Sequence, residues 1–182
     1  MWKGGVVIFV HNSLYFLNTD IVKHCEEQDV ETCALKLSLS ILKLCILTLY
    51  RAHTGNFSHF LLKLDAILQL LHTLTQHIII CQDININYLM ESEKKNQMDN
   101  LLLSCNLTSI NNFPVRVQNT SATATDNIFT DTSQFESYTI IPSLNGLSDH
   151  DAQLLMVSTY LHKNLKPSGK LIRTWYLILL IN

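Results

Sequence analysis

Charge is scarce in this sequence of 182 residues: charged side chains make up 15% of it, hydrophobic ones 47%, and the net charge is −2. A chain this apolar can bury enough surface to fold, which excludes an intrinsically disordered protein. The excess of lysine and arginine found in most nucleic-acid-binding proteins is absent, so composition gives no support to tight non-specific binding of DNA. The length fits a single globular domain with a sizeable core.

Cysteine motifs and long apolar runs are also missing. The five cysteines are an odd number without C-x-x-C spacing, which argues against both a cysteine zinc site and a disulfide framework. The apolar run Gly4–Val10 is too short for a secretory signal, and the 11-residue stretch Leu171–Ile181 falls short of the roughly 20 residues that span a bilayer. We therefore expect an intracellular protein, nuclear or cytoplasmic, that is not secreted and makes no membrane contact.

The apolar pattern predicts strands that are interrupted by one clear helix. From Phe57 to Leu71 apolar residues recur at three-and-four spacing, which predicts an amphipathic helix that covers a sheet, and a shorter helix follows around Met98. Short apolar or alternating runs predict strands at Gly4–Val10, Cys33–Leu39, Ile41–Tyr50, Ile78–Ile80, Asp126–Thr130, Tyr138–Ile141 and Ala152–Ser158. The order strand, helix, strand indicates an α/β fold.

Short extended pieces are predicted at Leu107–Ile110 and Pro114–Val117, and two segments are expected to be irregular. These are Asn12–Asp29 and the small-residue stretch Asn119–Thr125, while Pro142 is expected to end the strand before it. Residues 1–158 are assigned to one domain. Residues 159–182 are interpreted as a tail outside the main fold, because a lysine-rich stretch with proline and glycine precedes its apolar end.

One stretch, His77–Tyr88, carries the first chemical signal. Its apolar run ends abruptly at Asp83, and Asn85 follows two positions later. Such an apolar run is typical of a strand that is buried on both faces. Open α/β sheets place their sites at the carboxyl ends of their strands. The alternative interpretation is an Asx-type turn after a buried strand, since Asp and Asn are ordinary turn residues.

Further polar residues stand at later strand ends, namely Asp126, Asp149 and His150. Carboxylates with an amide suit Mg²⁺, and a carboxylate paired with an imidazole suits contact with a phosphate. Together they are the parts for hydrolysis of a phosphate ester by metal-activated water. Taken singly, Asp126 fits a turn or a cap, and Asp149 with His150 fits a solvated loop; the ordered set favours a site.

Six motifs in order give the chain a resemblance to a known family. From about Gly4 to Leu155 it resembles the endonuclease/exonuclease/phosphatase superfamily, and most closely the apurinic-type endonuclease domain of non-LTR retrotransposons. The motifs are Gly4–Val10, Leu49–Arg51, Ile80–Asn85, Asn112–Arg116, Thr125–Phe129 and Leu147–Asp151. The resemblance implies a deoxyribonuclease-like four-layer α/β/β/α sandwich that cleaves DNA phosphodiesters with Mg²⁺, or with Mn²⁺ in its place.

The resemblance also implies roles for single residues. Tyr50 contacts the scissile phosphate, Asp83 orients or deprotonates the attacking water, and Asn85 supports the developing charge. In the second half of the chain, Asp126 pairs with His150, which holds the phosphate. Asp149 is implied as a metal ligand, so that all six side chains are expected to meet at one end of the sheet.

The sequence departs from the family pattern in three places. Gln82 stands where the family usually has a glycine that permits close backbone approach, and Thr125 replaces an apolar residue. The family's upstream asparagine and metal-binding glutamate have no room before Gly4, and the nearest acidic residues are Glu26, Glu27 and Glu31. We therefore expect a sandwich without its first strands and with impaired activity. Two alternatives stay open: a non-catalytic remnant of a transposable element, or a phosphatase or phosphodiesterase for another phosphate ester.

Overall fold

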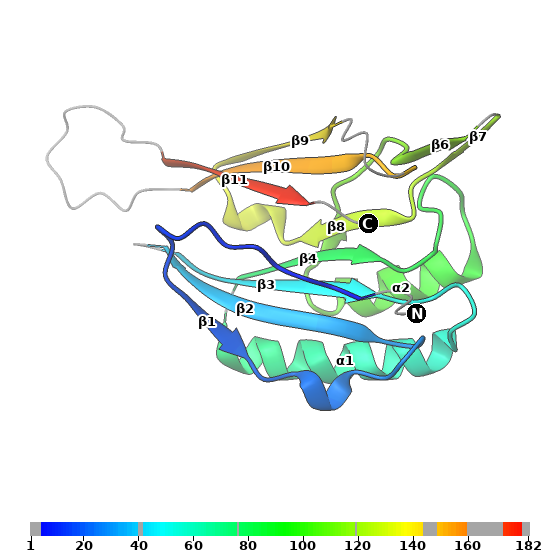
Figure 1. Ribbon diagram of the computed structural model, residues 1–182, viewed down its shortest axis with the longest axis horizontal. Coiled ribbons are helices and arrows are strands. Elements are labelled where there is room, and N and C mark those ends of the chain that lie inside the picture. Colours follow the sequence, from blue (N-terminus) through cyan, green and yellow to red (C-terminus); the bar gives the residue numbers. More distant parts are fainter. Residues whose placement is uncertain are drawn as a thin grey trace, which may run out of the picture.

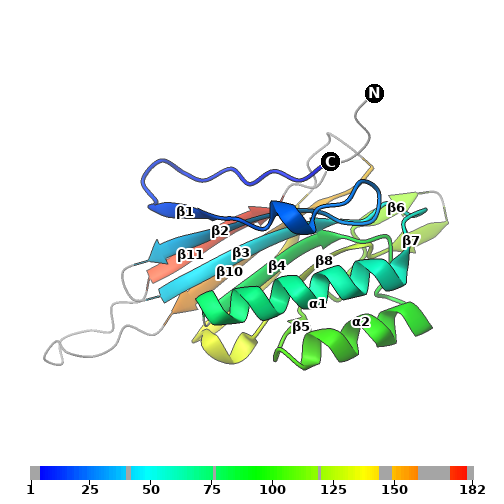
Figure 2. The same ribbon diagram turned by 90° about the horizontal axis from the view of Figure 1, so that it is seen from below.

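The computed structural model describes residues 5–39, 42–75, 77–118, 120–143, 149–159 and 173–179. Two sheets lie face to face, and two helices, α1 (Phe57–Leu74) and α2 (Glu93–Leu103), cover the outer face of the larger sheet (Figures 1 and 2). The predicted α/β class is confirmed. Within the described ranges both α-helices lie on this one side, so the layers are α/β/β, and the expected outer helical layer on the smaller sheet has no counterpart there.

The larger sheet has six strands, and only one pair of neighbours is parallel. In spatial order its strands are β1 (Phe16–Thr19), β2 (Glu31–Leu39), β3 (Leu42–Tyr50), β4 (His77–Asp83), β8 (Asp126–Thr130) and β5 (Thr108–Ser109). The parallel pair is β3 with β4, and α1 forms the connection between them, as the strand–helix–strand pattern predicts. The smaller sheet has the order β11 (Arg173–Leu179), β10 (Ala152–Thr159) and β9 (Ser137–Ser143), and β6 (Arg116–Gln118) with β7 (Ser121–Thr123) forms a separate hairpin.

Alternate residues of the central strands fill two separate cores. In β3, Leu47 and Leu49 face the helices and pack in one cluster with Phe60 of α1. Leu44 and Ile46 point the other way and pack with Leu155 and Val157 of β10 in the second cluster. The larger sheet is therefore buried on both faces, which explains why its central strands are almost wholly apolar.

The predicted N-terminal strand Gly4–Val10 is wrong for residues 5–10, which have no regular secondary structure. Ile8 and Val10 still pack against the core between the sheets, so the alternating apolar residues reflect burial without strand pairing. The first strand of the sheet is instead β1, which lies inside the stretch Asn12–Asp29 that was expected to be irregular. It pairs with β2. β1 is short and mostly exposed, so no apolar pattern marks it.

Three further corrections concern the second half of the chain. The segment Asn119–Thr125, expected to be a loop, contains β7. Strand β9 continues through Pro142, because β9 is an edge strand and an edge tolerates the missing N–H of proline. Residues Arg173–Leu179, assigned to a tail outside the main fold, form β11 and pair with β10. Their apolar run was too short for a bilayer but long enough for a strand.

Some predictions fall outside the described residues, namely residues 144–147 of a loop that the sequence predicts at Ser143–Leu147, and the lysine-rich stretch at 162–170. Among the helices that the structure does describe, none has the length and apolar character required to cross a bilayer.

The structure predicts that Gln82 destabilises the fold. Its side chain is 1% exposed, and within the described part of the chain neither its amide nitrogen nor its amide oxygen has a hydrogen-bond partner. A buried amide without partners costs about 1–3 kcal/mol, so Gln82→Met, which keeps the length of the side chain, should raise the free energy of unfolding by that amount. Urea denaturation measures it. The exposed Gln118→Met is the matched control and should change stability by less than about 0.5 kcal/mol. A loss of stability in Gln82→Met would mean that the amide has partners in solution.

Candidate active site

The pairing register of the larger sheet sets four polar side chains in one row. Directly opposite one another, from strand to strand, are Glu31, Tyr50, Asp83 and Asp126. Residues that face each other on neighbouring strands point to the same side of a sheet, and here that side is the one toward the smaller sheet. The row includes Glu31, one of the three nearest acidic residues to the family's missing glutamate and, because of its downstream position, a poor substitute for it.

The smaller sheet completes this row with a histidine. His150 precedes β10, and its Nδ1 lies 2.6 Å from Oδ2 of Asp126, so the expected hydrogen bond between the two residues is present. Asp83, Asp126 and His150 each offer a ligand atom, and these atoms all lie within 4.8 Å of one another. The three side chains come from β4, from β8 and from the start of β10, and they meet between the two sheets.

Asp126 is held rigidly and is almost completely buried, with 1% of its surface exposed. Its backbone oxygen accepts hydrogen bonds from the side chains of Asn111 (3.2 Å) and Gln153 (2.9 Å). Its Oδ1 is buried and, among the residues that the structure describes, has no hydrogen-bond partner. A buried carboxylate oxygen in this state is suited to a proton or a cation, and carboxylate oxygens are ligands that Mg²⁺ prefers. The residues present therefore fit a divalent cation at this end of the sheet.

Burial and charge shift the pKa values of these groups. Burial, with a further contribution from the Asp126 carboxylate, raises the pKa of Asp83 to about 6. The hydrogen bond with Asp126 raises the pKa of His150, against the opposing effect of burial. Burial and the neighbouring carboxylates of Asp83 and Glu31 raise the pKa of Tyr50, which keeps its phenol protonated. The site thus combines a carboxylate that can accept a proton near neutral pH with an imidazole that favours its charged form.

The loop after Asp83 is fixed by Asn85 and Arg51. The backbone N–H of Asn85 donates to Oδ1 of Asp83 (3.1 Å), so the Asx-type turn considered as the alternative is present. Asn85 has a φ of 54°, and its side-chain amide donates to the backbone oxygen of Arg51 (2.8 Å). The buried Arg51 guanidinium in turn donates to the backbone oxygens of Ile84, Ala52 and Gly55. Arg51 belongs to a quoted motif, but the sequence analysis gave it no role.

Asp149, the predicted metal ligand, has a cationic neighbour in the structure. Its carboxylate lies 2.5 Å from Nη2 of Arg116 and 4.0 Å from Nε2 of His150. The backbone of Arg116 pairs with that of His150 in an isolated β-bridge. This pairing brings Arg116, which lies 33 positions before Asp149 in the sequence, to the site. Sequence reasoning quoted Arg116 in a motif and missed the ion pair, because no local pattern connects the two residues.

Comparison with known proteins supports the architecture. No known family profile matches the sequence, and no curated protein matches it. Among solved structures, the endonuclease domain of TRAS1, a telomere-specific non-LTR retrotransposon, is similar with a TM-score of 0.65 and 11% identity, over 84% of this chain and 72% of that one.

Two other solved structures are similar at lower scores. One is Danio rerio TDP2 complexed with a single-strand DNA product, with a TM-score of 0.49 and 14% identity over 76% of this chain and 64% of that one. The other is an endonuclease/exonuclease/phosphatase family protein from Bacteroides thetaiotaomicron, with a TM-score of 0.45 and 14% identity over 66% and 52%. From the TRAS1 likeness, the chain has the deoxyribonuclease-like α/β sandwich fold of a retrotransposon endonuclease domain.

Proposed function

We propose that this chain is a hydrolase of phosphodiester bonds, and more specifically a Mg²⁺-dependent DNA endonuclease of the retrotransposon type. The observation that supports the proposal most is the meeting of Asp83, Asp126 and His150 within 4.8 Å at one end of the larger sheet. The fold shared with the TRAS1 endonuclease domain supports the same class of chemistry. The six proposed site residues are Tyr50, Asp83, Asn85, Asp126, Asp149 and His150.

In this proposal Asp83 is the general base. A carboxylate with a pKa of about 6 is ionised at neutral pH and remains basic enough to take a proton from an attacking water. Tyr50, opposite Asp83 in the neighbouring strand, donates its phenolic hydrogen bond to the scissile phosphate. Asn85 supports the developing charge through the second N–H of its side-chain amide, because the first N–H donates to the backbone oxygen of Arg51.

His150 and Asp126 act as a pair on the phosphate. Asp126 fixes the orientation of the imidazole through Nδ1 and stabilises its protonated form. A protonated imidazole then attracts a phosphate oxygen by charge as well as by hydrogen bonding.

Mg²⁺, with Mn²⁺ as a substitute, is the proposed cofactor, with Asp149 as its ligand. When bound, the ion neutralises charge on the phosphate and the leaving oxygen. Arg116 competes for the Asp149 carboxylate, and in the part of the chain that the structure describes no glutamate joins Asp83, Asp126 and His150. We infer weak metal binding, and a loss of about 3–4 kcal/mol of transition-state stabilisation would slow cleavage on the order of 10²–10³-fold.

Hydrolysis of another phosphate ester is the second candidate. The net charge of −2 gives little electrostatic attraction for duplex DNA, whereas a small phosphodiester needs only the site itself. The same residues would act in the same roles, so the two candidates differ in substrate and not in chemistry.

A plasmid-nicking assay tests the proposal. The purified chain should nick supercoiled DNA slowly with Mg²⁺ or Mn²⁺ and not with EDTA, and His150→Ala should abolish the activity because the phosphate loses its cationic partner. The exposed Asp20→Asn, which also removes one ionisable group, is the control and should retain full activity. Nicking that survives in His150→Ala would contradict the proposal. Absence of hydrolysis of both DNA and a small phosphodiester would favour a non-catalytic remnant.

The proposed base has a measurable cost in stability. Below pH 3.8 Asp83 is protonated in both the folded and the unfolded chain; between pH 3.8 and about 6 only the unfolded chain ionises, so stability falls as pH rises. Asp83→Asn removes this penalty and should raise the free energy of unfolding by about 2–3 kcal/mol at pH 8, with no gain below pH 4. Urea denaturation at several pH values measures the difference. A gain that is independent of pH would show that Asp83 titrates normally.

A further inference from the structure

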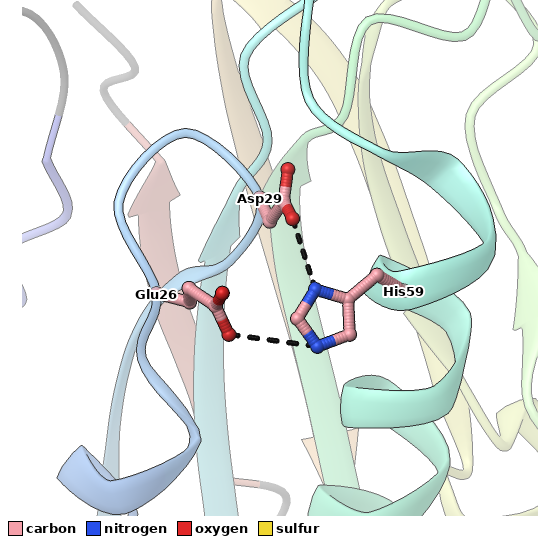
Figure 3. A group of neighbouring side chains, drawn as sticks. All are labelled: Glu26, Asp29 and His59. Atoms are coloured by element: carbon pink, nitrogen blue, oxygen red, sulfur yellow. Dashed lines mark hydrogen bonds and ion pairs between the residues drawn. The ribbon is translucent and has the colours of Figure 1, made fainter.

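A second cluster of metal-ligating side chains lies apart from the active site. Glu26 and Asp29 come from the turn before β2, and His59 comes from the first turn of α1 (Figure 3). Oδ2 of Asp29 lies 2.9 Å from Nδ1 of His59, and Oε2 of Glu26 lies 3.5 Å from Nε2 of the same ring. The two carboxylates therefore approach opposite nitrogens of one imidazole.

Asp29 determines which nitrogen of His59 carries the proton. Its Oδ1 accepts a hydrogen bond from the backbone N–H of Asn56 (2.7 Å), and its Oδ2 faces Nδ1 of His59. An ionised carboxylate can only accept a hydrogen bond, so Nδ1 of His59 donates to Oδ2 of Asp29. In the neutral ring the lone pair of Nε2 then faces Glu26. A carboxylate that holds a histidine through its far nitrogen is a common outer partner of a zinc ligand.

The spacing between Nε2 and Glu26 suits a shared cation better than a direct hydrogen bond. At 3.5 Å it exceeds the usual 2.7–3.2 Å of an N–H···O bond. Zinc binds imidazole nitrogen and carboxylate oxygen at about 2.0–2.2 Å, so two ligands at a tetrahedral angle lie roughly 3.4 Å apart. The ammonium group of Lys63 lies 3.5 Å from the same Glu26 oxygen, so this oxygen already has a cationic neighbour that a bound metal ion would replace.

Backbone hydrogen bonds hold the turn that carries Glu26 and Asp29 in place. Glu26 and Val30 exchange two backbone hydrogen bonds (2.7 and 2.9 Å), and the backbone oxygen of Gln28 accepts from Ala52 (2.9 Å). Gly55 packs against that oxygen so closely that an added Cβ would lie 2.4 Å from it. The turn is thus fixed against the loop that leads into α1, so binding of a metal ion there requires little further ordering of the backbone.

We propose that His59 and Glu26 bind a divalent transition-metal ion of the zinc class, with Asp29 as the residue that orients His59 and with water at the remaining positions. Imidazole with carboxylate suits Zn²⁺, whereas Mg²⁺, which is proposed at Asp149, prefers oxygen ligands. The bound ion joins the turn before β2 to the start of α1. It therefore stabilises the folded chain and takes no part in the proposed hydrolysis.

Titration calorimetry of the reduced full chain with Zn²⁺ tests the proposal, with thermal unfolding as a second readout. The chain should bind one Zn²⁺ at this cluster, and binding should raise the unfolding midpoint. Glu26→Gln and His59→Gln should each abolish both effects, while Asp29→Asn should weaken binding about 10–100-fold. The matched control is the exposed His72→Gln on the same helix, which should bind as the unchanged chain does.

Two other variants separate this cluster from competing zinc ligands. Asp83→Asn alters the active-site group, and Cys25→Ser removes the exposed thiol beside Glu26; both should retain the binding. Absence of Zn²⁺ binding overturns the proposal. Zn²⁺ binding that is lost in Asp83→Asn or in Cys25→Ser but kept in Glu26→Gln also overturns the proposal. Glu26 is exposed, so Glu26→Gln is expected to fold.

Discussion

The hydrogen bond between Asp126 and His150 is the interaction on which the site depends. It joins β8 of the larger sheet to the start of β10 in the smaller one, with 2.6 Å between Oδ2 and Nδ1. Because it raises the pKa of His150, its contribution to stability is complete below pH 6.5 and is lost as pH rises through the higher folded-state value. The same contact orients the sheets at their polar end and sets the charge of the group that faces the substrate in the proposed reaction.

The polar end of the sandwich buries groups that oppose folding in an otherwise apolar core. Asp83 keeps a raised pKa because burial and the Asp126 carboxylate both oppose its ionisation, and Oδ1 of Asp126 is buried without a partner in the part of the chain that the structure describes. Gln82 adds a buried amide next to Asp83. A fold selected for stability alone would not bury two carboxylates side by side, and the proposed binding of a cation gives them a use.

Local periodicity made the centre of the fold predictable. The apolar spacing of α1 and the apolar runs of β3 and β4 specify a strand–helix–strand unit. Residues on one face recur every three or four positions in a helix and every two positions in a strand, so the two elements leave different patterns in the sequence. The edge strands β1 and β11 could not be recognised from periodicity. β1 is mostly exposed, and β11 was judged only against the length of a bilayer span, so pairing between distant segments decided both.

The candidate site was predictable only in part. The position of Asp83 could be inferred from where an apolar run stops and that of Asp126 from where a predicted strand begins, and the approach of His150 followed from the resemblance in motif order. The ion pair of Asp149 with Arg116 and the Glu26–Asp29–His59 cluster could not be inferred, since each joins residues that lie about 30 positions apart with no local pattern. Long-range charge pairing depends on register and loop geometry, which composition and spacing do not specify.

The most direct test is a titration of His150 by NMR in the unchanged chain and in Asp126→Asn, with the resonance assigned through His150→Gln. We predict that the pKa of His150 lies above 6.5 in the unchanged chain and falls in Asp126→Asn, because burial alone lowers it. Inorganic phosphate should raise the pKa further in the unchanged chain, since an anion stabilises the imidazolium. A pKa that is the same in both chains, and insensitive to phosphate, would contradict the claim that Asp126 and His150 form a phosphate-binding pair.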